Sequence, residues 1–181
     1  MTNRAPLMRI SAATLPALHR AIADGRAPAE AARLARQFGF DSGEAFFEAL
    51  RDWNADQMGE PIEELSPDSF WETTATFFSS VGWGELTFER LHPGVGLLHS
   101  PDSAESQPNS GARHPACHVT TGILAHILSR VGGIDLAVME VQCRSAGDEP
   151  CRFLLGGKEA LQSVYEELRN GVSLDEAIDG L

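Results

Sequence analysis

The chain has three cysteines, and two of them lie close to a carboxylate. Cys143 and Cys151 flank the segment 144–150, Glu140 precedes Cys143 by three positions, and Cys117 precedes Glu140 by 23. Thiolates and carboxylates are ligands that zinc accepts in tetrahedral sites. Free cysteines, however, are usually small buried hydrophobic residues, and a Cys-x7-Cys spacing is wider than the common metal knuckle. The spacing alone therefore leaves a metal site and plain core packing open.

The residues around these cysteines predict how they could meet. Two apolar runs, 134–141 and 151–155, flank a segment rich in turn formers, which predicts an antiparallel hairpin. Residues three apart in a regular strand point to opposite faces. Glu140 and Cys143 can therefore share a site only if the strand has a bulge or ends near Cys143.

A helix is expected to supply the third cysteine. Pro115 opens a segment in which apolar residues recur at helical spacing up to position 131, and two glycines follow. Cys117 would lie in the first turn of this helix. There the helix dipole is expected to lower the pKa of the thiol and to favour the thiolate that a metal needs.

Three short segments around these residues resemble the 4-vinyl-reductase (4VR) domain family: CHVTTGIL at 117–124, EVQCRSAG at 140–147 and CRFL at 151–154. The family includes sensor domains of phenol- and toluene-responsive bacterial activators, bacteriochlorophyll-synthesis accessory proteins and distant vesicle-tethering subunits. The resemblance is specific over 117–155 and diffuse over 28–116. In the activator sensors this pattern binds a structural zinc. The resemblance thus implies a structural Zn site formed by Cys117, Glu140, Cys143 and Cys151.

The N-terminal half is expected to be helical. Residues 1–27 are interpreted as a loose lead-in, 1–13, followed by a short helix, and residues 28–181 as a 4VR-like ligand-binding domain. From Pro28 to Trp53 apolar residues recur at helical spacing, interrupted by Gly39 and Gly43. Either two helices meet there or one long helix packs closely through its glycines. The family resemblance favours the long helix.

The remaining pattern predicts the fold class. Alternating residues at 86–91 and 95–99 flank a Pro-Gly turn and predict a first hairpin before the cysteine-bearing one. We therefore expect an α+β fold, a single domain with an antiparallel sheet of two hairpins covered on one side by helices. The turn-rich loop 100–113 could be a lid, but a disordered surface excursion is the favoured interpretation.

Composition limits the partners. A net charge of −12 argues against nucleic acid and anionic membranes, both of which attract basic surfaces. No apolar run approaches the roughly 18 residues of a spanning helix, so no membrane insertion is expected. An odd number of cysteines without a secretory signal fits a reducing compartment, and a cytoplasmic location is expected.

No nucleophile elbow, phosphate-binding glycine loop or zincin helix is present, so an enzyme is the less expected class. Four protein ligands would also close the zinc shell, which favours a structural metal. The leading hypothesis is a zinc-stabilised sensory or carrier module for a small apolar or aromatic ligand. The alternatives are a tetrapyrrole-pathway accessory protein and a dimeric protein-interaction scaffold resembling tethering subunits.

The expected ligand pocket follows from the aromatic residues, which are concentrated between positions 46 and 88. Apolar and aromatic walls are typical of small-molecule sites, although core packing could use the same residues. Any output would pass through a homodimer or a downstream protein partner. The predicted pocket residues are Phe78, Trp83, Phe88, His99, His118 and Gly122.

Overall fold

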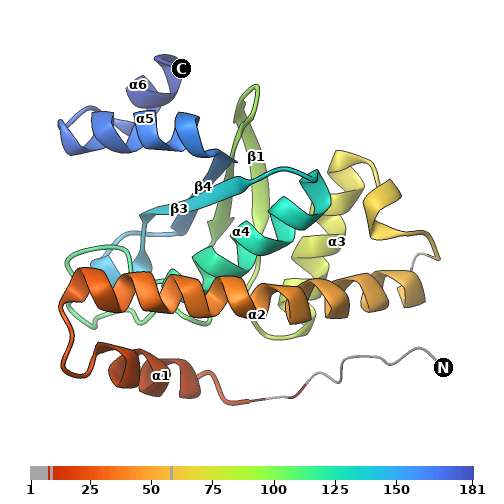
Figure 1. Ribbon diagram of the computed structural model, residues 1–181, viewed down its shortest axis with the longest axis horizontal. Coiled ribbons are helices and arrows are strands. Elements are labelled where there is room, and N and C mark those ends of the chain that lie inside the picture. The colour runs from red at the N-terminus through yellow and green to blue at the C-terminus, as the bar shows by residue number, and fades with distance from the viewer. Residues whose placement is uncertain (1–7, 9, 58) are drawn as a thin grey trace.

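The computed structural model describes residues 8, 10–57 and 59–181, and these form an α+β fold (Figure 1). Of the expected lead-in, residues 1–7 and 9 lie outside the described residues. The elements in chain order are α1 (Thr14–Ala23), α2 (Pro28–Gln57), η1 (Ile62–Glu64), α3 (Pro67–Ser80), β1 (Thr87–His92), β2 (Val95–Ser100), α4 (His118–Gly132), β3 (Leu136–Gln142), η2 (Arg144–Ala146), β4 (Cys151–Gly157), α5 (Lys158–Arg169) and α6 (Leu174–Asp179).

The four strands form one antiparallel sheet in the order β1-β2-β4-β3. Each hairpin pairs its own two strands, and β2 pairs with β4 from Val95 opposite Gly156 to Ser100 opposite Cys151. The two central strands therefore come from different hairpins. The predicted fold class, an α+β domain with a sheet of two hairpins, is confirmed.

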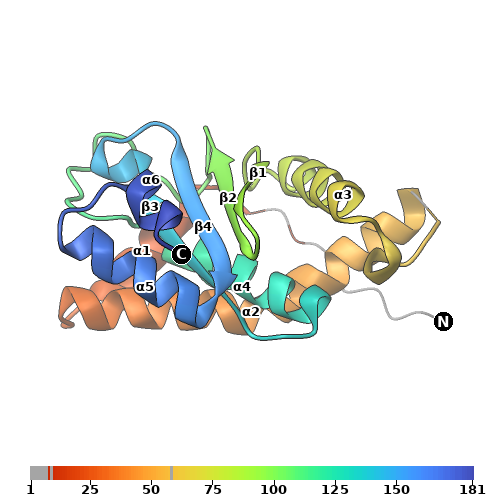
Figure 2. The ribbon, with the colours of Figure 1, turned by 90° about the horizontal axis from the view of Figure 1, so that it is seen from above.

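Helices cover both faces of the sheet, whereas the sequence predicted one covered face (Figures 1 and 2). Helices α2, α3 and α4 bury one face against Leu98 and Phe153, and α5 and α6 bury the other against Leu97 and Leu154. The one-sided prediction is wrong because successive residues of a strand point to opposite faces, and here both are apolar. Residues 158–181 supply the second layer.

Helix α2 is a single helix of 30 residues, about 45 Å long, as the resemblance predicted. Its Gly39 packs against the backbone of Val119 on α4, and Gly122 of α4 packs against the backbone of Arg36. A β-carbon at either glycine would collide with backbone atoms. The glycines thus allow α2 and α4 to approach at the backbone level. Phe38 on the same helix is 45% exposed.

The segment 101–117 is packed and hydrogen-bonded, so the favoured prediction of a disordered excursion is wrong. Ser103 and Glu105 are buried, and the Gln107 N–H donates to Ser145 Oγ at 2.8 Å. The polar residues of this segment are therefore used inside the fold. Helix α4 then begins at His118, three residues later than expected. No helix in the described part of the chain is long and apolar enough to cross a membrane.

Candidate metal centre and apolar cavity

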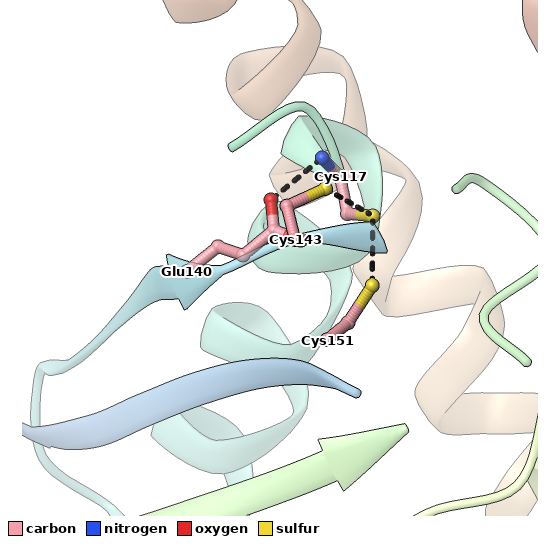
Figure 3. A group of neighbouring side chains, drawn as sticks. All are labelled: Cys117, Glu140, Cys143 and Cys151. Atoms are coloured by element: carbon pink, nitrogen blue, oxygen red, sulfur yellow. Dashed lines mark hydrogen bonds between the residues drawn. The ribbon is translucent and has the colours of Figure 1, made fainter. Parts of the chain in front are cut away.

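The three cysteines and Glu140 lie together at the end of the sheet where β3 stops and β4 starts (Figure 3). Cys117 precedes the first turn of α4, Glu140 lies in β3, Cys143 follows β3, and Cys151 opens β4. All three cysteines are fully buried and Glu140 nearly so. The grouping predicted from the sequence is therefore present in the fold, with one potential ligand atom from each side chain within 4.8 Å of the others.

A break in the β3 register brings Glu140 and Cys143 to the same site. Glu140 lies opposite Phe153, but Gln142 lies opposite Arg152, so the pairing shifts by one residue between them. β3 ends at Gln142, and Cys143 continues in an extended conformation before the 3-10 turn. Both conditions set by the sequence, a bulge and an early strand end, are met.

The distances between the sulfur atoms fit a tetrahedral metal. Cys117 Sγ lies 3.9 Å from Cys143 Sγ and 4.0 Å from Cys151 Sγ. A tetrahedral zinc ion with Zn–S bonds of about 2.3 Å separates its sulfurs by about 3.8 Å. Sulfurs joined by a disulfide are only about 2.05 Å apart. The cysteines are free thiols at the separation that one ion would require.

Glu140 carries one oxygen suited to ligation. Its Oε2 accepts a hydrogen bond from the Cys117 N–H at 2.8 Å. Its Oε1 is buried and has no hydrogen-bond partner among the described residues. A buried carboxylate oxygen without a partner is costly, and a metal ion would satisfy it. The donor set of three sulfurs and one oxygen therefore fits zinc.

The proton affinities of the cluster show how strongly its charges interact. Hydrogen bonds to Cys143 and then Cys151, followed by burial, raise the pKa of Cys117 far above its usual value. Burial, and next the charge of Cys143, raise the pKa of Glu140 to about 9. The pKa of Cys117 is therefore raised where the position at the helix start predicted a lowered one, because the hydrogen bonds to the neighbouring thiols and burial act in the opposite direction. A divalent cation would favour their deprotonated forms.

Backbone and side-chain groups around the cluster hold the ligands in place. The Cys143 N–H donates to Asp148 Oδ2 at 2.9 Å, and the Arg144 N–H donates to Cys151 Sγ at 3.3 Å. Ser103 Oγ lies 3.8 Å from Cys117 Sγ. Partners of this kind orient the ligands of metal sites. The sequence analysis did not identify Asp148 or Ser103, which look like ordinary loop residues.

Glu105 is the functional group that the sequence analysis missed most clearly. Its side chain has no exposed area, and it accepts hydrogen bonds from the backbone N–H groups of Val119 and Thr120 at 2.8 and 2.7 Å. His19 Nε2 lies 2.6 Å from Glu105 Oε1. Glu105 therefore caps the N-terminus of α4 from a distant segment. The sequence gives no local signal for this role, because a lone Glu in a polar loop is normally exposed.

An apolar cavity of about 550 Å³ includes Ala104, the residue before Glu105, in its lining. Its walls come from the residues before and within α1, the middle of α2, the end of α3 and the turn that follows. Among the described residues that line it, none has a charged side chain. The lining residues are Met8, Ile10, Ser11, Ala12, Leu15, Ala45, Phe46, Ala49, Ser79, Ser80, Val81, Gly82, Trp83 and Ala104.

Of the six predicted pocket residues, Trp83 lines this cavity, and its indole N–H donates to Thr120 Oγ1 at 3.0 Å. The other five have different surroundings in the fold. Phe78 is in the core, Phe88 stacks on Trp71, His99 pairs with Glu89, His118 is the first residue of α4, and Gly122 packs on α2. Burial, and then the charge of Arg36, lower the pKa of His118.

Comparison with known proteins places the cluster in a known domain. The family model described as the V4R domain matches residues 103–156, which include all four candidate ligands and Glu105. This confirms the resemblance predicted from the sequence for that part of the chain. No curated protein matches the chain.

Solved structures share the fold. The phenol-responsive sensory domain of the transcription activator PoxR, crystallised with phenol, is 20% identical with a TM-score of 0.67, covering 93% of this chain and 83% of that chain. Subunit 3 of a trafficking protein particle complex from Naegleria fowleri, covalently bound to palmitic acid, is 12% identical with a TM-score of 0.58 (80% and 91% covered). These two TM-scores, at identities below 25%, show a common fold.

A third structure is more distant in shape. A vinyl-4-reductase family protein from Methanocaldococcus jannaschii is 20% identical with a TM-score of 0.39, covering 77% of this chain and 92% of that chain.

Proposed function

We propose that this protein is a sensory or carrier module that binds a small, uncharged apolar or aromatic molecule. The observation that carries the proposal is the cavity of about 550 Å³, in which none of the described lining residues has a charged side chain. Its volume falls within the range of about 300–1,000 Å³ typical of small-molecule sites. Among the described lining residues an anionic ligand would find no cation to pair with, and a buried unpaired charge is costly.

The cavity supplies aromatic contacts on one side. Phe46 and Trp83 both line it and meet edge to face with ring centroids 5.0 Å apart. The Trp83 N–H is already bonded to Thr120, and the Ser80 hydroxyl donates to the Phe77 carbonyl at 2.7 Å. With these polar groups engaged, shape and apolar contact would dominate recognition. The fold shared with the phenol-responsive PoxR domain supports the sensor class.

The proposed zinc ion has a structural role. Cys117, Glu140, Cys143 and Cys151 would hold it, and four protein ligands leave no position for a reacting water. Zinc would cross-link the start of α4 to the hairpin of β3 and β4, because its ligands come from both. The proposal therefore assigns no catalysis to the metal.

Two other functions were expected as alternatives. A tetrapyrrole normally carries carboxylates, and the described lining residues offer these no charged partner, so they favour an uncharged ligand. A protein-interaction scaffold is supported by the fold shared with the trafficking particle subunit.

A homodimer is also proposed, and the exposed Phe38 and Phe40 on α2 are available for it. Sedimentation of the protein and a Phe38→Ser variant would test this, with a wild-type monomer well above micromolar concentration contradicting it.

A paired ligand set tests the sensor proposal. Toluene and benzoate share one ring and differ by a charge, so toluene should raise the melting temperature and benzoate should not. Ligand at a hundredfold excess over its dissociation constant stabilises the fold by about 2.7 kcal/mol, a readily measured shift. If toluene, phenol and naphthalene all leave the melting temperature unchanged, the scaffold function replaces the sensor function.

A further inference from the structure

Helix α1 forms one wall of the apolar cavity. Leu15 on α1, together with Ser11 and Ala12 just before it, lines the cavity opposite Ala49 and Trp83. α1 packs against α2, and its Leu18 and Ile22 contact the core only as half-buried residues. In Figure 1 it lies as a separate short helix beneath α2, on the outside of the molecule. A wall of this kind can move without disturbing the sheet.

A hydrogen bond between side chains ties this wall to the body of the protein. His19, on the same helix as Leu15, approaches Glu105 at 2.6 Å, and the His19 side chain is 22% exposed whereas Glu105 is fully buried. Glu105 is in turn fixed by the N–H groups of Val119 and Thr120. Hydrogen bonds to a carboxylate are stronger than those between neutral groups.

Further hydrogen bonds connect Glu105 and its neighbour to another wall of the cavity. Ala104, next to Glu105, lines the cavity, and its N–H donates to the Trp83 carbonyl at 2.9 Å. Trp83 lines the cavity as well and donates its indole N–H to Thr120, whose backbone N–H donates to Glu105. Glu105 therefore connects two walls of the cavity. It bonds α1 through His19 and the turn at Trp83 through Thr120.

From these hydrogen bonds we propose that the contact between His19 and Glu105 is a latch that holds α1 closed over the cavity. Glu105 is then the positioning residue for the wall that α1 forms. The role of the latch in controlling ligand entry, its gating role, rests on the proposed ligand-binding function. The contact that holds α1 in place does not. Opening the latch lets a molecule enter or leave beside α1. A bound molecule that contacts Leu15 favours the closed position.

Hydrogen exchange tests the latch without any ligand. In the zinc-loaded full chain, His19→Phe removes the donor but keeps an aromatic ring, and amides of residues 14–23 should exchange about tenfold faster or more, the change that about 1.4 kcal/mol produces. His19→Gln restores an N–H donor and should return the rate toward wild type. Arg20→Ala, at an exposed position on the same helix, is the matched control and should change nothing.

Amides of β4 serve as the internal reference, because global unfolding would accelerate them together with those of α1. Faster exchange confined to residues 14–23 in His19→Phe supports the latch. Equal rates in wild type and His19→Phe overturn it. Equal acceleration in His19→Phe and His19→Gln also overturns it, since that result would assign the effect to ring packing.

Dissociation of a neutral fluorescent probe, N-phenyl-1-naphthylamine, tests the gating role. The probe should leave His19→Phe about tenfold faster than it leaves wild type or Arg20→Ala, and its binding should slow exchange of residues 14–23 in wild type. Unchanged dissociation rates overturn gating while leaving the ligand site in place. Absence of probe binding to wild type overturns the ligand site and gating together, and the exchange rates still decide the latch.

Discussion

The cysteine cluster and the apolar cavity each use one residue of the segment 101–117, Cys117 and Ala104, and are built in opposite ways. The cluster gathers four acidic side chains that are buried and bonded to one another or to backbone N–H groups. The described residues that line the cavity are small, aliphatic or aromatic and carry no charge, and they enclose empty volume. One region is closed by its own residues, and the other has space for a molecule from outside.

This difference indicates where each function resides. A closed cluster suits a metal that holds α4 against the second hairpin, and an uncharged cavity suits an apolar ligand. Helix α4 links the two regions, because Cys117 directly precedes its first residue and Thr120 in its first turn bonds both Glu105 and Trp83. The following predictions separate the two regions, from the largest expected effect to the smallest.

Breaking the cluster should have the largest effect. Cys151→Ser replaces one sulfur ligand, so we expect loss of the bound zinc and of about 4 kcal/mol or more of unfolding free energy, because metal binding is part of folding in such sites. Elemental analysis of protein purified without chelator should give one zinc per wild-type chain. Wild type treated with a chelator should match the variant. Wild type without bound metal, or a variant that keeps its zinc, would contradict the proposed centre.

Separating α2 from α4 should have the next largest effect. Gly122→Ala puts a β-carbon against the α2 backbone and should cost about 1–3 kcal/mol through overpacking. Gly157→Ala is the matched control, since nothing lies within 4 Å of the β-carbon added there. Chemical denaturation of both variants measures the difference. Equal stabilities would show that the two helices can separate at little cost.

Filling the cavity should change binding more than stability. Ala49→Leu places a larger side chain inside the cavity, and we expect a change of under about 1.5 kcal/mol in unfolding free energy together with loss of the toluene-induced melting shift. Ala55→Leu makes the same change at an exposed position of α2 and should keep the shift. A full toluene shift in Ala49→Leu would place the ligand elsewhere.

A pH-dependent contact between α2 and α4 should have the smallest effect. The hydrogen bond from His126 to Glu44, at 2.9 Å, holds the pKa of Glu44 below its usual value of 4.5. Because the pKa of Glu44 is lower in the folded state, the stabilisation is present above pH 4.5. It is lost as the pH falls through the pKa that Glu44 has in the folded state. Because Glu44 is 46% exposed, the effect should stay under about 1 kcal/mol.

The measurement is the stability difference between wild type and Glu44→Gln as a function of pH. The difference should be greatest near neutral pH and should shrink below pH 4.5. Taking the difference cancels the acid lability of the metal centre. A difference that grows on acidification would reverse the assigned sign.

The cluster could be predicted from the sequence because local patterns determine most of it. Alternating residues and turn formers give the second hairpin, and the separation of Glu140 from Cys143 requires the bulge that β3 contains. Cys117 follows from the helix that begins just after it. The ligands need only a hairpin and a helix start to meet, and both leave periodic signals in the chain.

Only the tertiary structure decided the cavity and the role of Glu105. The cavity walls come from segments far apart in sequence, each made of residues that would fit any apolar core. Glu105 is buried because His19, Val119 and Thr120, all distant in the chain, supply its hydrogen bonds. Periodicity reports which face of an element is buried, but a buried charge depends on partners that only the folded chain brings together.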